Sequence, residues 1–204
     1  IDLANSLGLD WKYNHASDVF EEMAQIMPSL KNITWERVNN EDSVTYPCED
    51  KDKPGSEIVF AQKFPTSSGL GKIVPTNIIS PDELPDQEFP FVLTTGRLLE
   101  HWHTGAMTRR SVTLDNIEPE AVVSMNSSDM DYLKLQPGNK VKVKTRRGSI
   151  DLSVRQDREL PKGMIFIPFC FSEAAANKLT NPQLDPYGKI PEFKYCAAKV
   201  EINN

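Results

Sequence analysis

Short apolar runs recur along the second half of the chain and predict strands rather than helices. They span residues 89–95, 121–125, 140–145, 149–154, 164–169 and 195–202, and Gly or Pro turns separate most of them. Runs of this length between turn residues are typical of an all-β sandwich or barrel. Arg147 and Gly148 lie between two of the runs and predict the turn of a hairpin.

Two stretches have helical spacing instead. Ser17 is placed to cap a helix that runs to Ile26 or Met27, and Asn126 is placed to cap a short helix among the strands. Apolar residues of the first helix fall on one face and predict a stripe that packs into a core: Val19, Phe20, Met23, Ile26 and Met27. In the second helix, Met130, Leu133 and Leu135 are expected to face inward.

The first half of the chain has a different pattern, with long polar stretches between few apolar runs. Residues 36–57 are polar and predict a surface loop, and residues 58–64 and 73–79 predict two strands around a turn. Residues 81–90 contain four acidic residues and three prolines, which is typical of a linker. We therefore expect one domain over residues 1–80, a linker over 81–90 and a second domain over 91–204.

Composition narrows the classes of function. The formal net charge of -6 disfavours binding to nucleic acid or to an anionic membrane surface. No apolar run approaches the roughly 18 residues of a membrane span. The cysteines are Cys48, Cys170 and Cys196, an odd number without Cys-x-x-Cys spacing, which argues against a disulfide framework, a zinc site or an iron–sulfur cluster.

The densest chemical signal follows the strand predicted at residues 89–95. Thr95 and Gly96 form a small-residue turn whose backbone N–H groups could cradle phosphate, and Arg97 adds a planar fork that matches phosphate oxygens. His101, His103 and Thr104 offer donors and acceptors for a polar ring. The set suits a nucleotide or a pyrophosphate-bearing cofactor. The alternative is a strand end with a surface arginine and two structural histidines; a two-histidine metal site lacks an evident third ligand.

Three further segments add candidates. Arg109 and Arg110 could neutralise a pyrophosphate, or belong to a solvated charge run. Asn177, in a segment rich in small residues, carries the donor and acceptor that read a pterin or guanine edge, unless it lies exposed at a helix start. Near the end of the chain, Lys194 could meet a phosphate or carbonyl, and its neighbours Phe193 and Tyr195 could stack on a ring.

These segments resemble a known family. TTGRLLEHWHTGAMTRR (residues 94–110), EAAANKLTNPQLDP (173–186) and KIPEFKYCAAKVE (189–201) resemble the molybdopterin oxidoreductases of the dimethyl-sulfoxide-reductase superfamily. The combination most resembles the C-terminal part of a formate dehydrogenase catalytic subunit. The resemblance implies a mainly β fold with some α: a double-psi β-barrel that binds the dinucleotide, preceded by the tail of an α/β domain.

The resemblance also implies a cofactor and its contacts. The cofactor is bis-(molybdopterin guanine dinucleotide) with molybdenum or tungsten, used for two-electron oxidation of formate to carbon dioxide. The family's cofactor contacts correspond here to Thr95, Gly96, Arg97, His101, His103, Thr104, Asn177 and Lys194. The family's metal-ligating Cys or selenocysteine, its catalytic His and Arg and its iron–sulfur cysteines lie in upstream domains. No catalytic or metal-ligating residue is therefore expected in this chain, which should be inactive alone.

The implied partners are the remainder of the catalytic subunit and electron-transfer subunits that carry iron–sulfur clusters or flavin. We expect the cytoplasm as compartment, with the periplasm as the alternative. Two other functions stay open: the equivalent portion of a nitrate reductase, and a stand-alone pterin-dinucleotide-binding subunit of a complex like formylmethanofuran dehydrogenase. An α/β remnant in the first domain favours a piece of a catalytic subunit over a dedicated barrel subunit.

Overall fold

A computed structural model describes residues 1–203 of the 204-residue chain. The chain divides into two compact units, the first covering Ile1–Thr76 and the second beginning at Asn77. Each unit is described by itself.

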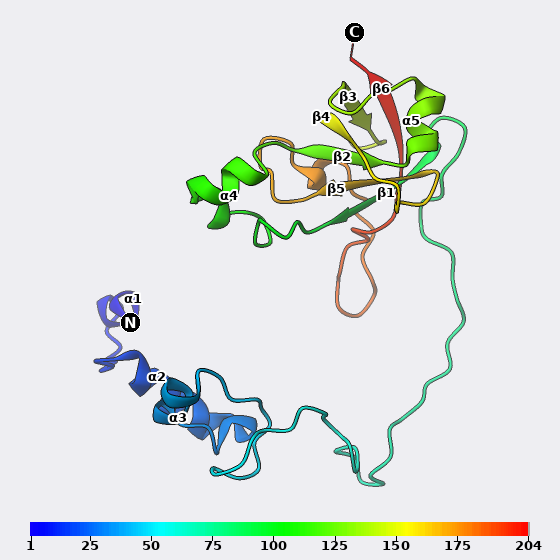
Figure 1. The fold of residues 1–204 in the computed structure, drawn as a ribbon. Helices are drawn as coiled ribbons and strands as arrows, with labels where there is room; N and C mark the ends of the chain where they lie inside the picture. The colour runs from blue at the N-terminus through cyan, green and yellow to red at the C-terminus, as the bar shows by residue number, and fades with distance from the viewer. Residues whose placement is uncertain (204) are drawn as a thin grey trace. The chain divides into compact units, whose positions relative to one another are not determined.

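The second unit is a closed barrel of six strands (Figure 1). The strands are β1 (Phe91–Gly96), β2 (Val122–Met125), β3 (Lys140–Lys144), β4 (Ser149–Gln156), β5 (Met164–Pro168) and β6 (Cys196–Ile202). They neighbour one another in the order β1-β5-β2-β4-β3-β6. β1 pairs in parallel with β5 and β2 with β4, and the other neighbours are antiparallel. The mainly β fold and the barrel predicted from the sequence are confirmed.

The core of the barrel follows from the alternation along its strands. In β3, Val141 and Val143 are fully buried, whereas the intervening lysines face outward. Ile165 and Ile167 of β5 are likewise fully buried. The predicted hairpin is confirmed, because Thr145 N–H donates to the Gly148 carbonyl at 2.9 Å between the antiparallel strands β3 and β4. Closure leaves no sheet edge unpaired, which stabilises a domain of this size.

Short helices connect the strands. They are η2 (Thr108–Arg110), α4 (Val112–Ile117), α5 (Ser127–Leu133) and η3 (Ala176–Lys178). α5 begins as predicted, since the Asn126 side chain accepts a hydrogen bond from Ser128 N–H at 2.9 Å. Met130 is buried in the core as expected. The sequence pattern does not predict α4, which has only six residues and exposes Val112 and Ile117.

The acidic segment 81–90 lies against the barrel. Glu83 Oε1 accepts hydrogen bonds from Arg146 Nη1 at 2.9 Å and from Ala197 N–H at 3.0 Å, and Glu83 Oε2 accepts one from Arg147. Asp86 Oδ2 accepts one from Arg146 Nη2 at 2.5 Å. These contacts fix the segment to the β3–β4 hairpin and to β6.

The first unit is helical. It contains α1 (Asp2–Ser6), α2 (Ala16–Ile26), η1 (Pro28–Leu30) and α3 (Trp35–Glu41). Its core is small, with Leu30, Ile33 and Cys48 buried and a few half-buried neighbours around them. The strands predicted at 58–64 and 73–79 are wrong: neither segment is paired, because no strand in this part of the described chain lies beside them. The predicted loop 36–57 is also wrong at its start, where Thr34 caps α3 by accepting from Arg37 N–H at 3.1 Å.

α2 covers the predicted range with a different cap. His15, not Ser17, is the N-cap: its side chain accepts from Ser17 N–H at 3.2 Å, and Asp18 accepts from His15 N–H at 3.0 Å. The apolar stripe predicted as core is largely exposed, with Met23 43% and Ile26 71% accessible. A unit with so few buried residues has too little interior to cover the whole stripe.

Candidate cofactor-binding site

A cavity of about 340 Å³ opens at one end of the barrel. It is lined by Thr95, Arg97, His103, Thr104, Phe169, Asn177, Phe193 and Lys194. Thr95 lies next to the last residue of β1, Phe169 follows β5, and Lys194 lies shortly before β6. Since β1 and β5 are parallel neighbours, their carboxyl ends meet at one edge and bring these segments together. Six of the eight residues predicted to contact a cofactor line this cavity.

Arg97 and His103 form one wall. Arg97 Nη2 lies 3.2 Å from His103 Nε2. A guanidinium only donates, so Nε2 accepts and the imidazole proton resides on Nδ1. His103 has a left-handed backbone with φ 53°, uncommon outside glycine, which bends the loop back toward Arg97. Its ring centroid lies 5.6 Å from that of Phe169.

Lys194 and Thr95 also line the cavity and contact each other. Lys194 Nζ donates to the Thr95 carbonyl oxygen, and Thr95 Oγ1 donates to the Phe193 carbonyl oxygen at 2.9 Å. These two bonds tie the segment before β6 to the end of β1. An ammonium has three donors, so two on Lys194 remain available to a ligand.

Asn177 lies in η3, with its side chain exposed at the cavity. Within residues 1–203 its carboxamide has no hydrogen-bond partner; only its backbone carbonyl accepts a bond, from Thr180 Oγ1 at 3.2 Å. The donor and the acceptor of the side chain both stay free for a ligand edge.

Two predicted contacts lie outside the cavity. Gly96 is buried, and a Cβ atom at this position would lie 2.5 Å from Cε2 of Phe166, so glycine here makes room for the half-buried Phe166 ring of the neighbouring strand. His101 is 1% exposed, and its Nε2 lies 2.8 Å from the Glu118 carbonyl oxygen. That carbonyl accepts, so Nε2 carries a proton. Nδ1 of His101 is buried without a partner in the described part of the chain.

Arg109 also has a different role from the phosphate contact that the sequence suggested. Its Nη1 lies 2.7 Å from each carboxylate oxygen of Glu173, and its Nε lies 3.0 Å from Asp115 Oδ1. Burial raises the pKa of Glu173, but hydrogen bonds, including those from Arg109, outweigh it and hold that pKa below its usual range. Both partners of the pair are therefore charged at neutral pH.

Phe169 is the cavity residue that the sequence analysis missed as a site residue. It belongs to an apolar run, and its sequence pattern predicts only a strand residue. Its position is predictable once β5 is known to pair in parallel with β1, because the residue after β5 then lies beside the residue after β1. Phe169 N–H in fact donates to the Gly96 carbonyl at 3.1 Å.

The cysteines do not take part in this site. Burial raises the pKa of the Cys170 and Cys196 thiols to about 11, so both are protonated at neutral pH. Within residues 1–203 no group of three or more His, Cys, Asp or Glu side chains is arranged to hold a metal ion. Over the same residues no helix has the length and hydrophobicity needed to span a membrane.

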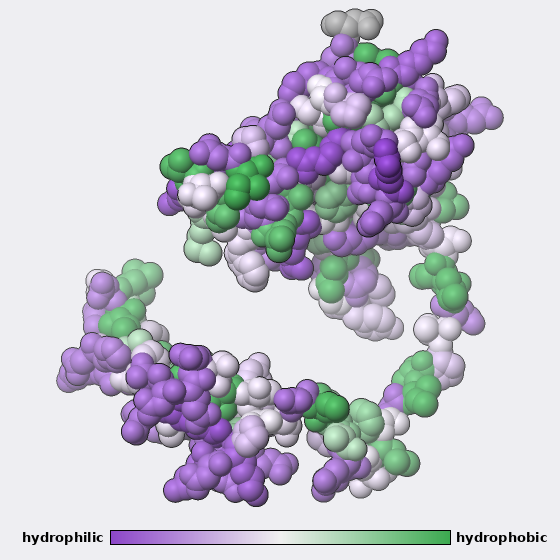
Figure 2. Space-filling view, viewed as in Figure 1, coloured by the Kyte–Doolittle hydropathy of each residue, from purple (hydrophilic) through white to green (hydrophobic). Residues whose placement is uncertain are grey.

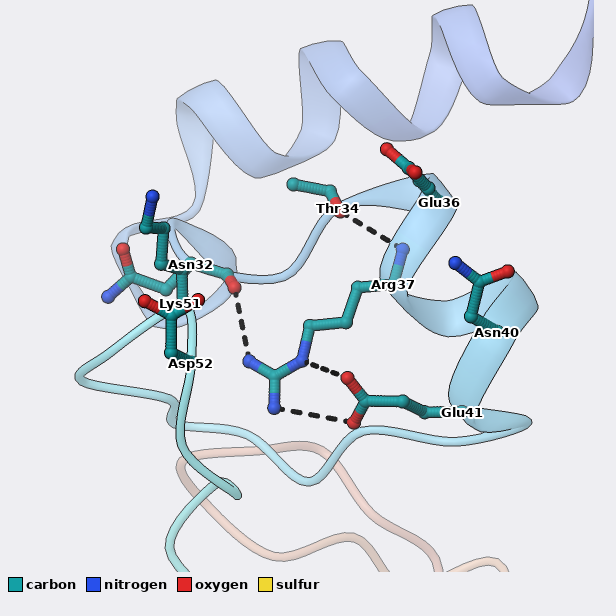
Figure 3. A pocket seen from close by; sticks show the side chains of 8 residues that line it. All are labelled: Asn32, Thr34, Glu36, Arg37, Asn40, Glu41, Lys51 and Asp52. Atoms are coloured by element: carbon teal, nitrogen blue, oxygen red, sulfur yellow. Dashed lines mark hydrogen bonds and ion pairs between the residues drawn. The ribbon is translucent and has the colours of Figure 1, made fainter.

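The first unit has a polar pocket of its own, of about 310 Å³ (Figure 3). Its guanidinium, from Arg37, is already engaged: Nε lies 2.8 Å from Glu41 Oε1, and Nη2 donates to the Lys53 carbonyl at 2.6 Å. Nη1 donates to the Asn32 carbonyl at 3.5 Å, as the close view shows. These bonds close the loop after Cys48 onto α3, which explains the pocket as a structural feature.

The closed barrel gathers cations, aromatic rings and a free carboxamide around one cavity, and these groups suit a ligand with phosphate oxygens and a heteroaromatic ring. Residues 91–197 match the family described as the Molydopterin dinucleotide binding domain. The chain belongs to this family.

Relatives extend the match to nearly the whole chain. Over 201 residues, 98% of this chain, it is 42% identical to the F420-dependent formate dehydrogenase subunit alpha of Methanocaldococcus jannaschii. It is 29% identical over 208 residues to the assimilatory nitrate reductase catalytic subunit of Bacillus subtilis. The chain spans only about 30% of the length of these relatives. Among solved structures, acetylene hydratase from Pelobacter acetylenicus shares the fold, with a TM-score of 0.53 and 22% identity over 57% of this chain and 19% of that one.

Proposed function

We propose that this chain is the C-terminal, cofactor-binding portion of a molybdenum- or tungsten-dependent formate dehydrogenase, and that its cavity binds part of bis-(molybdopterin guanine dinucleotide). When bound, the cofactor would supply two-electron transfer for the oxidation of formate to carbon dioxide. The observation that carries the proposal is the cavity itself, which gathers cations, aromatic rings and a free carboxamide from segments far apart in sequence. Family membership and the 42% identical formate dehydrogenase relative support it.

The cavity residues fit the chemistry of a pterin dinucleotide. Arg97 and Lys194 are the cations suited to phosphate oxygens. Phe169 and Phe193 are the aromatic residues of the cavity lining suited to stacking on a flat heterocycle. Asn177 offers both a donor and an acceptor to the edge of such a ring. Lys194 contacts the Thr95 carbonyl and Arg97 contacts the His103 imidazole. Both cations keep further N–H donors free for a ligand.

The chain's own residues would bind and orient the cofactor rather than react. Arg97 keeps its guanidinium against His103, so the fork is held in place before a phosphate arrives, which lowers the entropic cost of binding. The Thr95–Phe193 and Lys194–Thr95 bonds hold the segment before β6 against the end of β1. Phe169 and Phe193 exclude water from the ring face. We propose no catalytic or metal-ligating residue in this chain.

The proposed partners are the remainder of the catalytic subunit, with its iron–sulfur cluster, and electron-transfer subunits with iron–sulfur clusters or flavin. The M. jannaschii relative is named F420-dependent, and we propose the same electron acceptor here. We place the complex in the cytoplasm.

The nitrate reductase alternative rests on the B. subtilis relative, and its 29% identity makes it the second candidate. A stand-alone barrel subunit is disfavoured, because the formate dehydrogenase relative also aligns with the helical first unit.

One experiment tests these alternatives. The enzyme containing this chain, purified anaerobically, should yield a fluorescent oxidised pterin and GMP on acid hydrolysis, and formate should drive F420 reduction. Nitrate-dependent oxidation of reduced viologen without formate activity would instead assign the nitrate reductase function. Absence of any pterin would show that the enzyme does not bind the proposed cofactor.

A further inference from the structure

Two loops carry most of the cavity wall. Residues 97–110 provide Arg97, His103 and Thr104, and residues 169–178 provide Phe169 and Asn177. Neither His103 nor Asn177 lies in a strand, so the hydrogen bonds of the barrel do not by themselves set the distance between them.

Arg109 and Glu173 join the two loops. Arg109 Nη1 contacts both carboxylate oxygens of Glu173 at 2.7 Å. The Arg109 side chain is 22% exposed and that of Glu173 is 51% exposed. Arg109 Nε is held by Asp115 at 3.0 Å, which orients the guanidinium toward Glu173. Neither member of the pair lines the cavity.

Buried residues of the barrel unit also pack the two loops together beside the Arg109–Glu173 pair. The Arg109 guanidinium lies 4.6 Å from the ring centroid of Phe171, a fully buried residue of the second loop. On the first loop, the buried His101 ring meets Phe171 edge-on at 5.7 Å. Gly105 packs so tightly that a Cβ there would lie 2.6 Å from the Cys170 carbonyl oxygen. Ion pair, cation–π contact and ring packing therefore join the two loops at one point.

We propose that Arg109 and Glu173 are positioning residues that hold the two cavity-lining loops in register, so that His103 and Asn177 meet opposite parts of one cofactor. The proposal rests on the proposed function of the cavity. Its physical basis is that a charge-assisted pair with defined geometry fixes both distance and orientation between two otherwise separate loops. Arg109, read from sequence as a phosphate contact, acts through Glu173 instead.

The test compares variants in the complete enzyme loaded with its cofactor. Arg109→Met removes the charge and the donors but keeps the aliphatic stem, and Glu173→Gln keeps the shape and removes the charge. The matched control is Arg146→Met. Arg146 also binds two carboxylates and lies 4.6 Å from a phenylalanine ring, that of Phe89, but no residue of its hairpin lines the cavity.

The readouts are the rate of pterin release after dilution, measured by fluorescence of the oxidised pterin, and the thermal midpoint of each protein. We expect release about tenfold faster in Arg109→Met, about the effect of losing one hydrogen bond to a charged group. Glu173→Gln should accelerate it less, and the double variant no more than Arg109→Met alone. Arg109→Lys should recover part of the loss, and Arg146→Met should release pterin at the wild-type rate.

Faster release at a thermal midpoint equal to that of Arg146→Met supports positioning. If Arg109→Met is too unstable to purify, Glu173→Gln decides, because its half-exposed side chain contributes little to the core. Release at the wild-type rate in Glu173→Gln overturns the proposal, and so does a double variant that releases pterin faster than Arg109→Met by the full effect of Glu173→Gln. A wild-type enzyme without pterin would instead refute the proposed function.

Discussion

Arg97 is the cavity residue whose chemistry is most specific at the scale of a single side chain. It contacts His103 at 3.2 Å and has no carboxylate partner in the described chain, unlike Arg109. Its charge is therefore available to a phosphate. In the complete enzyme, Arg97→Ala should weaken cofactor binding by about one to two powers of ten in affinity, the effect of losing a charge-assisted hydrogen bond. The pterin content per mole of purified protein should fall as a result.

Arg97→Lys should recover only part of this loss, because lysine keeps the charge without the fork. Arg110→Ala is the matched control, since Arg110 is an exposed arginine of the same loop that does not line the cavity. Pterin content equal in Arg97→Ala and Arg110→Ala would contradict the phosphate role.

Gly105 is required by backbone conformation and by space together. Its φ is 74°, and a Cβ would lie 2.6 Å from the Cys170 carbonyl oxygen and 2.9 Å from Arg109 Cγ. Gly138 has a similar φ of 86° but open space around it. Gly138→Ala should therefore lower the free energy of unfolding by about 1–2 kcal/mol through strain alone. Gly105→Ala should cost about 3 kcal/mol or more because overpacking adds to the strain. Urea denaturation checks both, and equal costs would show that the loops do not pack as described.

The sequence predicts which residue types the site contains, but it does not predict which of their side chains face the cavity. Arg97 and Asn177 were found because their chemistry suits a dinucleotide. Gly96 and His101 belong to the same motif as Arg97, and only the barrel shows that one accommodates Phe166 and the other turns inward to Glu118. Phe169 was missed because an apolar residue after a strand gives no chemical signal until the parallel partner of that strand is known.

At the scale of elements, strands were predictable where a barrel closes around them. All six predicted strands of the second unit form, with ends within about two residues of the expected ones. The runs at 58–64 and 73–79 have a similar local pattern and form no strand, because a strand needs a neighbour to accept its hydrogen bonds and none is present there. The exposed fractions of Ile73 and Ile78, 93% and 101%, are the consequence.

Glu83 is the anchor of the acidic segment on the barrel. Burial raises its pKa, but the hydrogen bonds from Arg147 and Ala197 N–H and the charge of Arg146 outweigh that effect, so the pKa of Glu83 lies below its ordinary value. A carboxylate with a lowered pKa in the folded state stabilises the fold above its unfolded pKa, and this stabilisation is lost as pH falls through the folded value.

Glu83→Gln should therefore lower the free energy of unfolding at pH 7 by about 1.5–3 kcal/mol. The difference from wild type should shrink as pH drops below about 4.3, where glutamate in an unfolded chain takes up its proton. Chemical denaturation across pH 3–7 measures it, with Glu88→Gln as the control on the same segment. A difference independent of pH would show that the charge of Glu83 is not what holds the segment.

At the scale of the whole molecule, the two units differ in how much of their apolar surface is covered. Figure 2 shows hydrophobic residues on the molecular surface. In the first unit the exposed apolar residues include Val19, Met23 and Ile26 of α2. The barrel core comprises residues from all six strands, whereas the first unit buries only Leu30, Ile33 and Cys48. Residues 77–204 should therefore fold cooperatively without the first unit, and residues 1–76 should be the less stable part.

Limited proteolysis of the 204-residue chain should cleave first between residues 57 and 80, where the backbone forms no regular structure, and leave the barrel intact.

The segment 77–204 should melt at a higher temperature than the segment 89–204, because the shorter one lacks Glu83 and Asp86 and leaves Arg146 and Arg147 without their carboxylates. Loss of the carboxylates from these two partly exposed arginines should cost about 2 kcal/mol, enough to shift the midpoint of a domain of this size by several degrees. Circular dichroism of the two segments measures the shift. Equal midpoints would mean that the acidic segment is only a tether, and early degradation of the barrel would mean that its stability depends on the first unit.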